Sequence, residues 1–178
     1  MTHYSILKTS MLGDLLLLAS STQLAGIYFL HCPHAPAIRA DWLLNPRQAI
    51  LREAGEQLQA YLQGASQGFS LALDCNGTHF QQEIWRQIAL IPFGQTITYT
   101  ELAQRAGATR AIRAAGTATG KNPFSIVIPC HRVVGKDGSL GGYAGGVDRK
   151  SRLLELEHPR DLRTELVRRN ESLPASAQ

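Results

Sequence analysis

The sequence predicts a mixed α/β (α+β) fold in two parts, a small amino-terminal α/β scaffold at residues 1–75 and a mostly helical part at residues 76–158. Two observations lead to this prediction. Short apolar or alternating runs separated by turn residues dominate the first part, as in small sheets. Segments with helical periodicity and helix start and stop signals dominate the second. With 178 residues, 44% of them hydrophobic, the chain is long enough to bury a core.

The first part contains four predicted strands and one predicted helix. The strands are His3–Lys8, Leu15–Ala19, Ala25–Leu30 and Phe69–Leu73. A Ser-Ser-Thr-Gln turn between the second and third strands indicates an antiparallel meander. We expect the helix to begin near Pro46, which suits a first helical turn, and to end at Gly64. Its apolar face consists of Leu51, Ala54, Leu58, Tyr61 and Leu62.

The second part begins with a capping box, Thr78-His-Phe-Gln81, in which two side chains satisfy the first backbone N–H groups of a helix. This helix should run to about Leu90, where Ile91-Pro-Phe-Gly94 breaks it. Two more helices are predicted at Thr100–Ala106 and from Ala108 to about Lys121, with Gly107 between them. Two helices joined by a short glycine turn are typical of a helix-turn-helix.

The last of these helices consists mostly of residues with very small side chains, together with Arg110 and Arg113. The small residues are Ala111, Ala114, Ala115, Gly116, Ala118 and Gly120. Glycine within a helix costs roughly 1 kcal/mol relative to alanine, so two glycines indicate a close approach, either to another part of the chain or to a ligand. Major-groove helices carry long polar side chains, whereas a smooth helix with one or two arginines suits a narrow groove.

Basic charge is concentrated in the second part. Residues 1–75 contain four Lys/Arg and five Asp/Glu, whereas residues 76–178 contain fourteen and nine. Between Arg86 and Lys136 there is one acid, Glu101, and there are seven basic residues. The seven are Arg86, Arg105, Arg110, Arg113, Lys121, Arg132 and Lys136. This pattern is typical of a surface that faces phosphates, and charge alone fits a solvated face equally well.

Composition and patterning favour a cytoplasmic protein. The longest apolar run near the start, Leu15–Ala19, is too short to span a bilayer, and no export signal is visible. Three cysteines are an odd and small number, which argues against a disulfide framework and for a reducing compartment. Cys32 with His34 and Cys75 with His79 match no familiar zinc-ligand spacing, so no metal site is predicted.

The stretch Ile126–Val134, IVIPCHRVV, places Cys130 between a proline and a histidine, with an arginine next. A thiolate nucleophile needs positive charge and a proton acceptor nearby, whereas a buried structural cysteine needs neither. Neighbouring side chains of an extended segment point in opposite directions, so a turn or a water must connect Cys130 with His131. We interpret Cys130 as a nucleophile, and Cys32 and Cys75 as cysteines that pack as small hydrophobic side chains.

Several ordered motifs identify a family. They are Thr98–Ala103 (TYTELA), Arg113–Gly116 (RAAG), Asn122-Pro123, Pro129–Val133 (PCHRV), Gly142–Gly146 (GYAGG), and Lys150, Leu153, Leu154 and Glu157. In this order and spacing they resemble the O6-methylguanine-DNA methyltransferase family. The resemblance covers about residues 78–157. It implies a ribonuclease-H-like amino-terminal domain and a helix-turn-helix that binds DNA.

The resemblance implies that the Cys130 thiolate takes the alkyl group from O6-alkylguanine, and also from O4-alkylthymine, in duplex DNA. The thioether is stable, so each molecule acts once, and neither cofactor nor metal is needed. His131 serves as the base through a water, with Glu157 holding its other nitrogen. Asn122 bridges the recognition helix and the cysteine loop. Tyr99 crowds a phosphate and donates a proton to the departing guanine.

The resemblance also implies how DNA is held. The nucleotide is flipped from the minor-groove side, and Arg113 takes its place in the duplex. The expected DNA-binding residues are Arg113, Ala114, Gly116, Thr119 and Arg132, and the expected pocket residues are Val133, Tyr143, Ala144 and Lys150. The implied partner is double-stranded DNA with O6-alkylguanine, bound by a monomer in the cytoplasm, or in the nucleus of a eukaryote. The Gly135–Gly146 loop is predicted to be a hairpin.

One departure and three alternative functions need mention. Gly120 stands where some relatives carry a long basic side chain, which predicts a weaker phosphate contact there. A non-enzymatic relative that binds alkylated DNA replaces the reactive cysteine, usually with tryptophan, so Cys130 argues against it. A transcription regulator would need a dimer interface or further domains, and a thiol hydrolase would turn over more than once per molecule.

The segment Pro159–Gln178 extends beyond the resemblance and is predicted to be a partly flexible basic tail. Its four arginines add nonspecific affinity for phosphates. We predict that deleting this tail weakens DNA binding at low salt and leaves methyl transfer intact. Fluorescence anisotropy over a salt series, combined with a transfer assay, tests this, and a loss of transfer in the truncated protein would contradict it.

Overall fold

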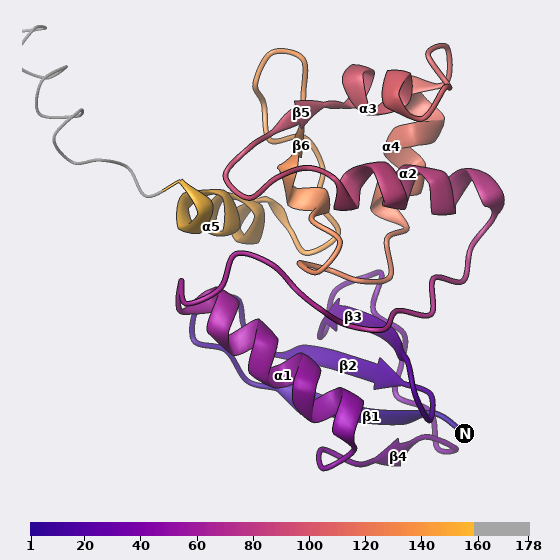
Figure 1. Ribbon diagram of the computed structural model, residues 1–178, viewed down its shortest axis with the longest axis vertical. Coiled ribbons are helices and arrows are strands. Elements are labelled where there is room, and N and C mark those ends of the chain that lie inside the picture. The colour runs from indigo at the N-terminus through magenta and orange to yellow at the C-terminus, as the bar shows by residue number, and fades with distance from the viewer. Residues whose placement is uncertain (159–178) are drawn as a thin grey trace, which may run out of the picture.

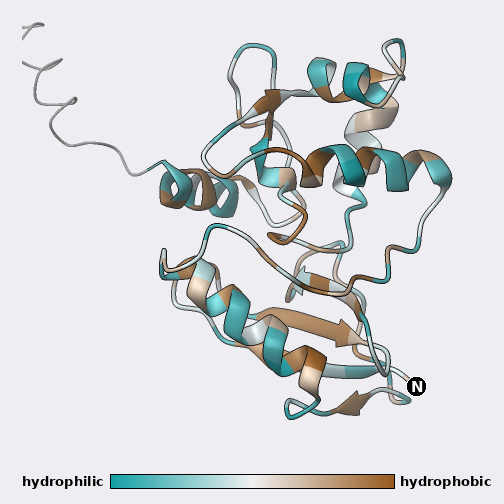
Figure 2. Cartoon of the chain, viewed as in Figure 1, coloured by the Kyte–Doolittle hydropathy of each residue, from teal (hydrophilic) through white to brown (hydrophobic). Residues whose placement is uncertain are grey.

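The N-terminal part is built on a four-stranded sheet with the order β3-β2-β1-β4 (Figure 1). In this computed structural model, which describes residues 1–158, β1 (His3–Leu7), β2 (Leu15–Ala19) and β3 (Leu24–Phe29) form an antiparallel meander. β4 (Leu43–Leu44) pairs with β1 in parallel. β2 is hydrophobic along its length (Figure 2), and all of its residues are buried, so both faces of this central strand are covered.

α1 (Ala49–Leu62) packs against β1, β2 and β3 and covers one face of the sheet (Figure 1). Its buried residues are Ile50, Leu51, Ala54, Leu58 and Tyr61, which confirms the predicted apolar face. The helix begins later than expected. The Gln48 N–H donates to the Asn45 carbonyl at 3.1 Å, and this turn leaves Pro46 ahead of the helix.

The strand predicted at Phe69–Leu73 does not form. Leu73 makes one isolated parallel bridge with Leu24, at the start of β3. Farther along β3, the same edge is occupied by another segment, in which Phe124 bridges Ile27. The alternating hydrophobicity of residues 69–73 has the period of a strand, but only one residue of β3 is available to pair with this segment.

Four helices and a two-stranded parallel sheet make up residues 76–158. They are α2 (His79–Ala89), β5 (Ile97–Thr98), α3 (Tyr99–Arg105), α4 (Ile112–Gly120), β6 (Val133–Val134) and α5 (Val147–Glu157). α2, α3 and α4 pack against one another. The predicted capping box of α2 is present, since the Thr78 hydroxyl accepts from Gln81 N–H at 3.3 Å and the Gln81 amide oxygen accepts from Thr78 N–H at 2.9 Å.

α4 begins four residues later than the sequence predicted. The Ala111 N–H donates to the Ala108 carbonyl at 2.7 Å, and Ala111 has φ −107° and ψ 35°, so residues 108–111 form a turn. α3 is capped by the Thr98 hydroxyl, which accepts from Glu101 N–H at 3.1 Å. The two helices are thus joined by a longer turn than a single glycine.

The Gly135–Gly146 loop is a turn and not the predicted hairpin. The Gly135 N–H donates to the Ser139 carbonyl at 2.8 Å, but no return strand follows. Gly138 and Gly141 have φ of 78° and 61°, which only glycine adopts easily, and these bends prevent an extended strand. β6 pairs with β5 instead.

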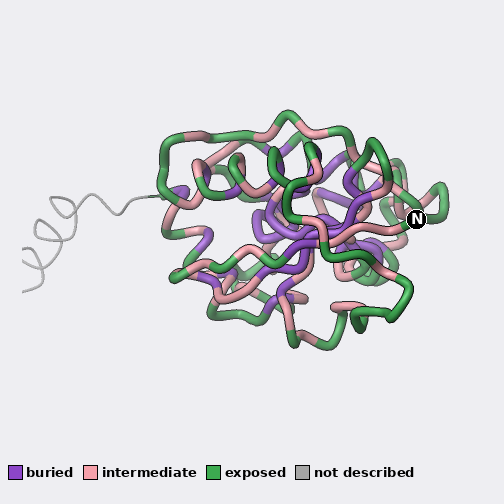
Figure 3. Tube along the Cα trace, turned by 90° about the horizontal axis from the view of Figure 1, so that it is seen from below, coloured by how far each residue is buried: buried purple, intermediate pink, exposed green. Residues whose placement is uncertain are grey.

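One hydrophobic core passes through both parts, and Figure 3 shows its buried positions in the interior of the trace. It includes Leu17 and Ile27 from the sheet and Ile84, Phe124 and Leu153 from the other part. The mixed α/β class is confirmed. Within residues 1–158, no helix combines the length and the apolar character needed to cross a membrane, and the predicted tail at 159–178 lies outside the described residues.

Candidate active site at Cys130

Two tight turns bring Cys130 to its position. The segment after α4 runs along β3, where Ile27 N–H donates to the Pro123 carbonyl and Ser125 N–H to the Ile27 carbonyl, at 2.8 and 3.0 Å. Val127 N–H then donates back to the Ser125 carbonyl at 2.9 Å, a γ-turn with Ile126 at φ 74°. For a β-branched residue this φ is strained, and it is held by complete burial.

A second turn of this kind precedes the cysteine. Cys130 N–H donates to the Ile128 carbonyl at 2.7 Å across Pro129, which has φ −78° and ψ 62°. Cys130–Arg132 then form one turn of 3₁₀ helix. The β-branched run is therefore bent and not extended, and the helical turn decides how Cys130 and His131 project.

Asn122 holds this loop from inside. Its amide nitrogen donates to the Ile128 carbonyl at 2.8 Å and lies 3.2 Å from the Cys130 sulfur, and its amide oxygen accepts from Phe124 N–H at 2.9 Å. Burial raises the pKa of the Cys130 thiol, whereas the Asn122 hydrogen bond and the charge of Lys150 act to lower it. Asn122 thus fixes the loop and favours a negative sulfur.

His131 is fully buried and bonded to the carboxylate of Glu157, with 2.7 Å between Nε2 and Oε1. An ionised carboxylate only accepts, so the proton lies on Nε2 and Nδ1 carries a lone pair. This Nδ1 is buried and has no hydrogen-bond partner among residues 1–158. Burial lowers the pKa of His131 against the opposing effect of Glu157, which favours a neutral imidazole able to accept a proton.

Arg132, which we expected to contact DNA, is buried inside the protein. Its guanidinium is buried, donates to both oxygens of Glu157 at 2.9–3.1 Å, and reaches the Ile91 carbonyl at 2.5 Å. The structure therefore shows Arg132 in an internal ion pair with Glu157 and not at a surface that DNA could contact. Burial would raise the pKa of Glu157, but hydrogen bonds from His131 and Arg132 outweigh it and hold the pKa at about 2.

Tyr61, which has no predicted functional role, lies at the same carboxylate. Its hydroxyl donates to Glu157 Oε1 and lies 3.5 Å from His131 Nε2. Tyr61 was expected only as part of an apolar helix face. The available signal was its hydroxyl, because a tyrosine that is completely buried usually has a hydrogen-bond partner.

Lys150 is also fully buried. Its ammonium donates to the carbonyls of Val133, at 2.5 Å, and Leu140. Burial lowers the pKa of Lys150 to about 8, although the nearby Cys130 sulfur acts in the opposite direction. Val133 itself is completely buried, with its carbonyl bonded to Lys150.

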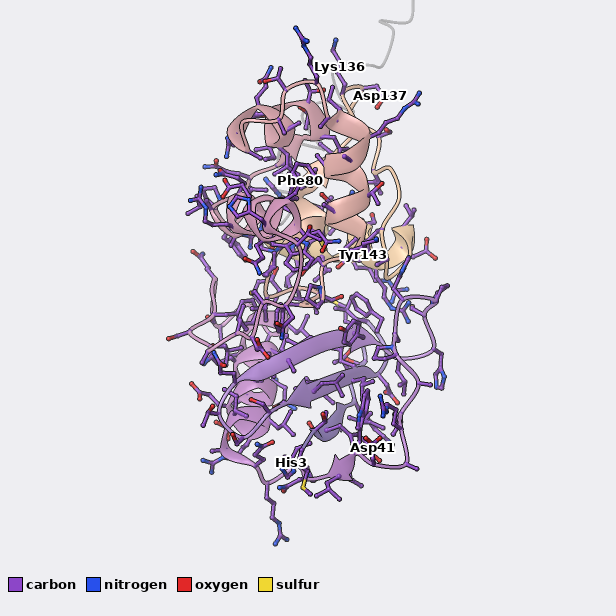
Figure 4. All side chains as sticks on the ribbon, turned by 90° about the vertical axis from the view of Figure 1, so that its right-hand side faces the viewer. His3, Asp41, Phe80, Lys136, Asp137 and Tyr143 are labelled. Atoms are coloured by element: carbon purple, nitrogen blue, oxygen red, sulfur yellow. The ribbon has the colours of Figure 1, made fainter. Side chains whose placement is uncertain are left out.

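A cavity of about 470 Å³ opens beside Cys130. Its lining residues are His34, Tyr99, Gly116, Thr119, Gly120, Cys130, Gly142, Tyr143 and Ala144. Of the predicted pocket residues, Tyr143 and Ala144 line the cavity, whereas Val133 and Lys150 do not. Gly116 and Thr119 of α4 line it as well, together with His34, Gly120 and Gly142, which were not predicted as pocket residues. The volume lies in the range of small-molecule sites. Figure 4 shows Tyr143 at the junction of the two parts, where its ring meets Phe29 with 5.9 Å between centroids.

α4 forms one wall of this cavity. Arg113 and Ala114 are exposed, whereas Thr119 is buried with its hydroxyl bonded to the Ala115 carbonyl at 2.8 Å. A methyl group added at Gly116 would meet only the Tyr99 ring, at 3.8 Å, and at Gly120 nothing lies within 4 Å. Packing within the described chain therefore does not require these glycines, which favours an approaching ligand.

The basic surface is smaller than the sequence suggested. Arg86 pairs with Glu83 at 2.8 Å, Arg105 pairs with Glu101 at 2.7 Å, and Arg132 is buried. The remaining basic residues of that stretch are Arg110, Arg113, Lys121 and Lys136. All four are exposed, and they form no ion pair with any residue from 1 to 158. In the described part of the chain, no three His, Cys, Asp or Glu residues are grouped to hold a metal.

Comparisons with known proteins agree with this site. Residues 79–159 match the family described as 6-O-methylguanine DNA methyltransferase, DNA binding domain. A methylated-DNA–protein-cysteine methyltransferase of Methanosarcina barkeri is 44% identical over 155 residues, which is 87% of this chain and 96% of that protein. The crystal structure of Mycobacterium tuberculosis OGT in complex with DNA is similar with a TM-score of 0.81 and 40% identity, covering 89% of this chain and 94% of that chain.

The fold and the buried Cys130 site therefore define the class of DNA-repair alkyltransferases. Within this class, the chain belongs to the methylated-DNA–protein-cysteine methyltransferase family.

The Glu157 network predicts a specific pH dependence of stability. The pKa of the Glu157 carboxyl in the folded protein is about 2, below its ordinary value of 4.5. The contribution of Glu157 to the free energy of unfolding is therefore present above pH 4.5 and is lost as the pH falls toward 2. We predict that Glu157→Gln, which leaves Arg132 buried without its counter-charge, lowers the free energy of unfolding by about 3 kcal/mol at neutral pH.

This difference should shrink as the pH falls through that window. Urea denaturation of both proteins between neutral pH and pH 2 measures it. Glu155→Gln, an exposed change on the same helix, is the matched control. A pH-independent difference between Glu157→Gln and the parent would be evidence against the ionised, paired carboxylate.

Proposed function

We propose that this protein repairs alkylated DNA by moving the alkyl group from the O6 oxygen of guanine to the sulfur of Cys130. The proton of the Cys130 thiol passes to His131, and the thiolate attacks the alkyl carbon in line with the oxygen. A sulfur–carbon bond forms and the carbon–oxygen bond breaks, with its electron pair left on guanine. A proton from Tyr99 then neutralises the guanine, and the thioether remains on the protein.

The observation that carries this proposal is the position of the Cys130 sulfur. Cys130 lines a cavity of about 470 Å³, and the next residue in the chain, His131, is a neutral imidazole held by Glu157. Asn122 lies 3.2 Å from the sulfur and can donate to the thiolate as it forms. The positive charge of Lys150 acts in the same direction. Cys130 is 5% exposed, so its sulfur is reached through the cavity, by an inserted base or by a reagent small enough to enter it.

We further propose that α4 enters the minor groove and that the damaged nucleotide is flipped into the cavity. The outer face of α4 presents Arg113 and Ala114, and the glycines at 116 and 120 leave room for a backbone or base. Arg113 fills the place of the flipped nucleotide, because it is the long cationic side chain on that face. Arg110, Lys121 and Lys136 contact phosphates.

The remaining assignments follow from the same proposal. Tyr143 and Ala144 contact the O6 side of the base, since both line the cavity with Cys130. Tyr99 lines the cavity, and its hydroxyl lies 3.5 Å from the Gly142 carbonyl. A phosphate approaches the Tyr99 side chain here. We propose that O4-alkylthymine is a second substrate and that the protein acts as a monomer in the cytoplasm. Residues 76–158 are proposed to be the catalytic and DNA-binding domain, and residues 1–75 the scaffold domain.

A labelling experiment tests the proposed reaction. The protein is incubated with duplex DNA that carries a deuterated methyl group on guanine O6, and its peptides are analysed by mass spectrometry. We expect one labelled methyl per protein, on the peptide that contains Cys130. Cys130→Ser should remain unlabelled, and Cys75→Ser, which changes a cysteine outside the cavity, should react as the parent does. Label that stays on the DNA, or repeated turnover by one molecule, would reject the proposal.

A further inference from the structure

Tyr61 connects the sheet-bearing part of the chain to the catalytic carboxylate. It lies near the end of α1 and is completely buried, and its hydroxyl donates to Glu157 Oε1. The same hydroxyl lies 3.5 Å from His131 Nε2. Ninety-six positions separate Tyr61 from Glu157 in the sequence, so this contact depends on how the two parts pack together.

Ring packing alone does not explain why residue 61 carries a hydroxyl group. The Tyr61 ring lies 5.0 Å from the Phe69 ring and 6.0 Å from the Phe93 ring, between centroids, and a phenylalanine would make the same contacts. Burial raises the pKa of Tyr61 far above its usual value, so the hydroxyl keeps its proton and acts as a donor. Among residues 1–158, the hydroxyl donates to Glu157 and lies 3.5 Å from His131 Nε2, and the nearby Arg132 guanidinium also acts on its pKa.

The donors to Glu157 compete for its negative charge. Oε1 accepts from Tyr61, His131 and Arg132, whereas Oε2 accepts from Arg132 and from Gly94 N–H at 3.2 Å. Each donor draws on the charge that would otherwise stabilise an imidazolium at His131. The Arg132 and Gly94 bonds already fix the carboxylate, so the Tyr61 hydroxyl mainly changes its basicity.

We propose that Tyr61 is a positioning residue that sets the proton affinity of His131 and thereby the reactivity of Cys130. The inference rests on the proposed function only in taking His131 as the base for Cys130. The other ionisable groups around His131 and Cys130 are Glu157 and Lys150 of α5, Arg132 of the same turn, Tyr143 of the loop before α5 and Tyr99 of α3, and His34 also lines the cavity. None of them changes in a Tyr61→Phe variant.

Alkylation by iodoacetamide tests this without DNA. The reagent is small enough for the cavity, and it reacts with thiolate and not with thiol. Its rate at Cys130, followed by peptide mass spectrometry over a pH series, reports how much thiolate His131 allows. Cys75, which lies outside the cavity, is read in the same samples as an internal reference.

In Tyr61→Phe the carboxylate loses one donor and becomes more basic, so the imidazolium is more stable. We expect the midpoint of the Cys130 pH profile to move up by about half a pH unit. Above the midpoint the rate should rise about threefold, since half a unit corresponds to that factor. Below the midpoint the two profiles should coincide. Replacing Tyr61 by 3,5-difluorotyrosine, a stronger donor with the same shape, should shift the midpoint in the opposite direction.

The matched control is Tyr28→Phe, which removes a hydroxyl from β3 that has no hydrogen-bond partner in the described part of the chain. Thermal unfolding of each variant confirms folding, and the difluorotyrosine protein keeps the test open if the phenylalanine variant unfolds. Unchanged profiles in both Tyr61 variants, or an equal loss of rate at every pH, would overturn the inference. Methyl transfer from duplex DNA, measured separately on the parent, decides the proposed function independently of this result.

Discussion

A single buried carboxylate organises this molecule. Glu157 accepts hydrogen bonds from Tyr61 of α1, from Gly94 after α2, and from His131 and Arg132 of the cysteine turn. A carboxylate without access to water is tolerated only when donors and a counter-charge surround it, and here four residues from three separate segments supply them. Because the donors come from both parts of the chain, satisfying this group also fixes how the sheet and the helical part fit together.

The same constraint prepares the chemistry at Cys130. Arg132 neutralises Glu157, so His131 rests without charge and presents Nδ1 as an acceptor. The thiol is buried and favours its protonated form, while Asn122 and Lys150 favour the anion. Burial is the largest of these effects, so the pKa of the Cys130 thiol is raised overall. Strain at Ile126 and the γ-turn at Pro129 show that the backbone is bent to place the sulfur there, and hydrogen bonds to β3 hold the bent segment.

The sequence predicted the helices, the meander and the central site residues because these depend on local patterns or on ordered motifs. In the structure Asn122 lies against the Cys130 sulfur, and His131 is bonded to Glu157. Arg132 was assigned to DNA, since a basic residue in a motif gives no sign of which way its side chain points. Tyr61 was hidden in a helical apolar face, and His34 carried no pattern at all. The strand predicted at residues 69–73 failed because pairing depends on a free neighbouring edge, which is a property of the whole fold.

Glu157 holds His131 neutral, with its proton on Nε2 and its Nδ1 free to accept. Nitrogen-15 NMR of the imidazole measures this protonation state, because the two nitrogens differ strongly in chemical shift when only one is protonated. We expect a protonated Nε2 and an unprotonated Nδ1 at neutral pH. A proton found on Nδ1, or an imidazole charged at that pH, would show that Glu157 does not act in this way.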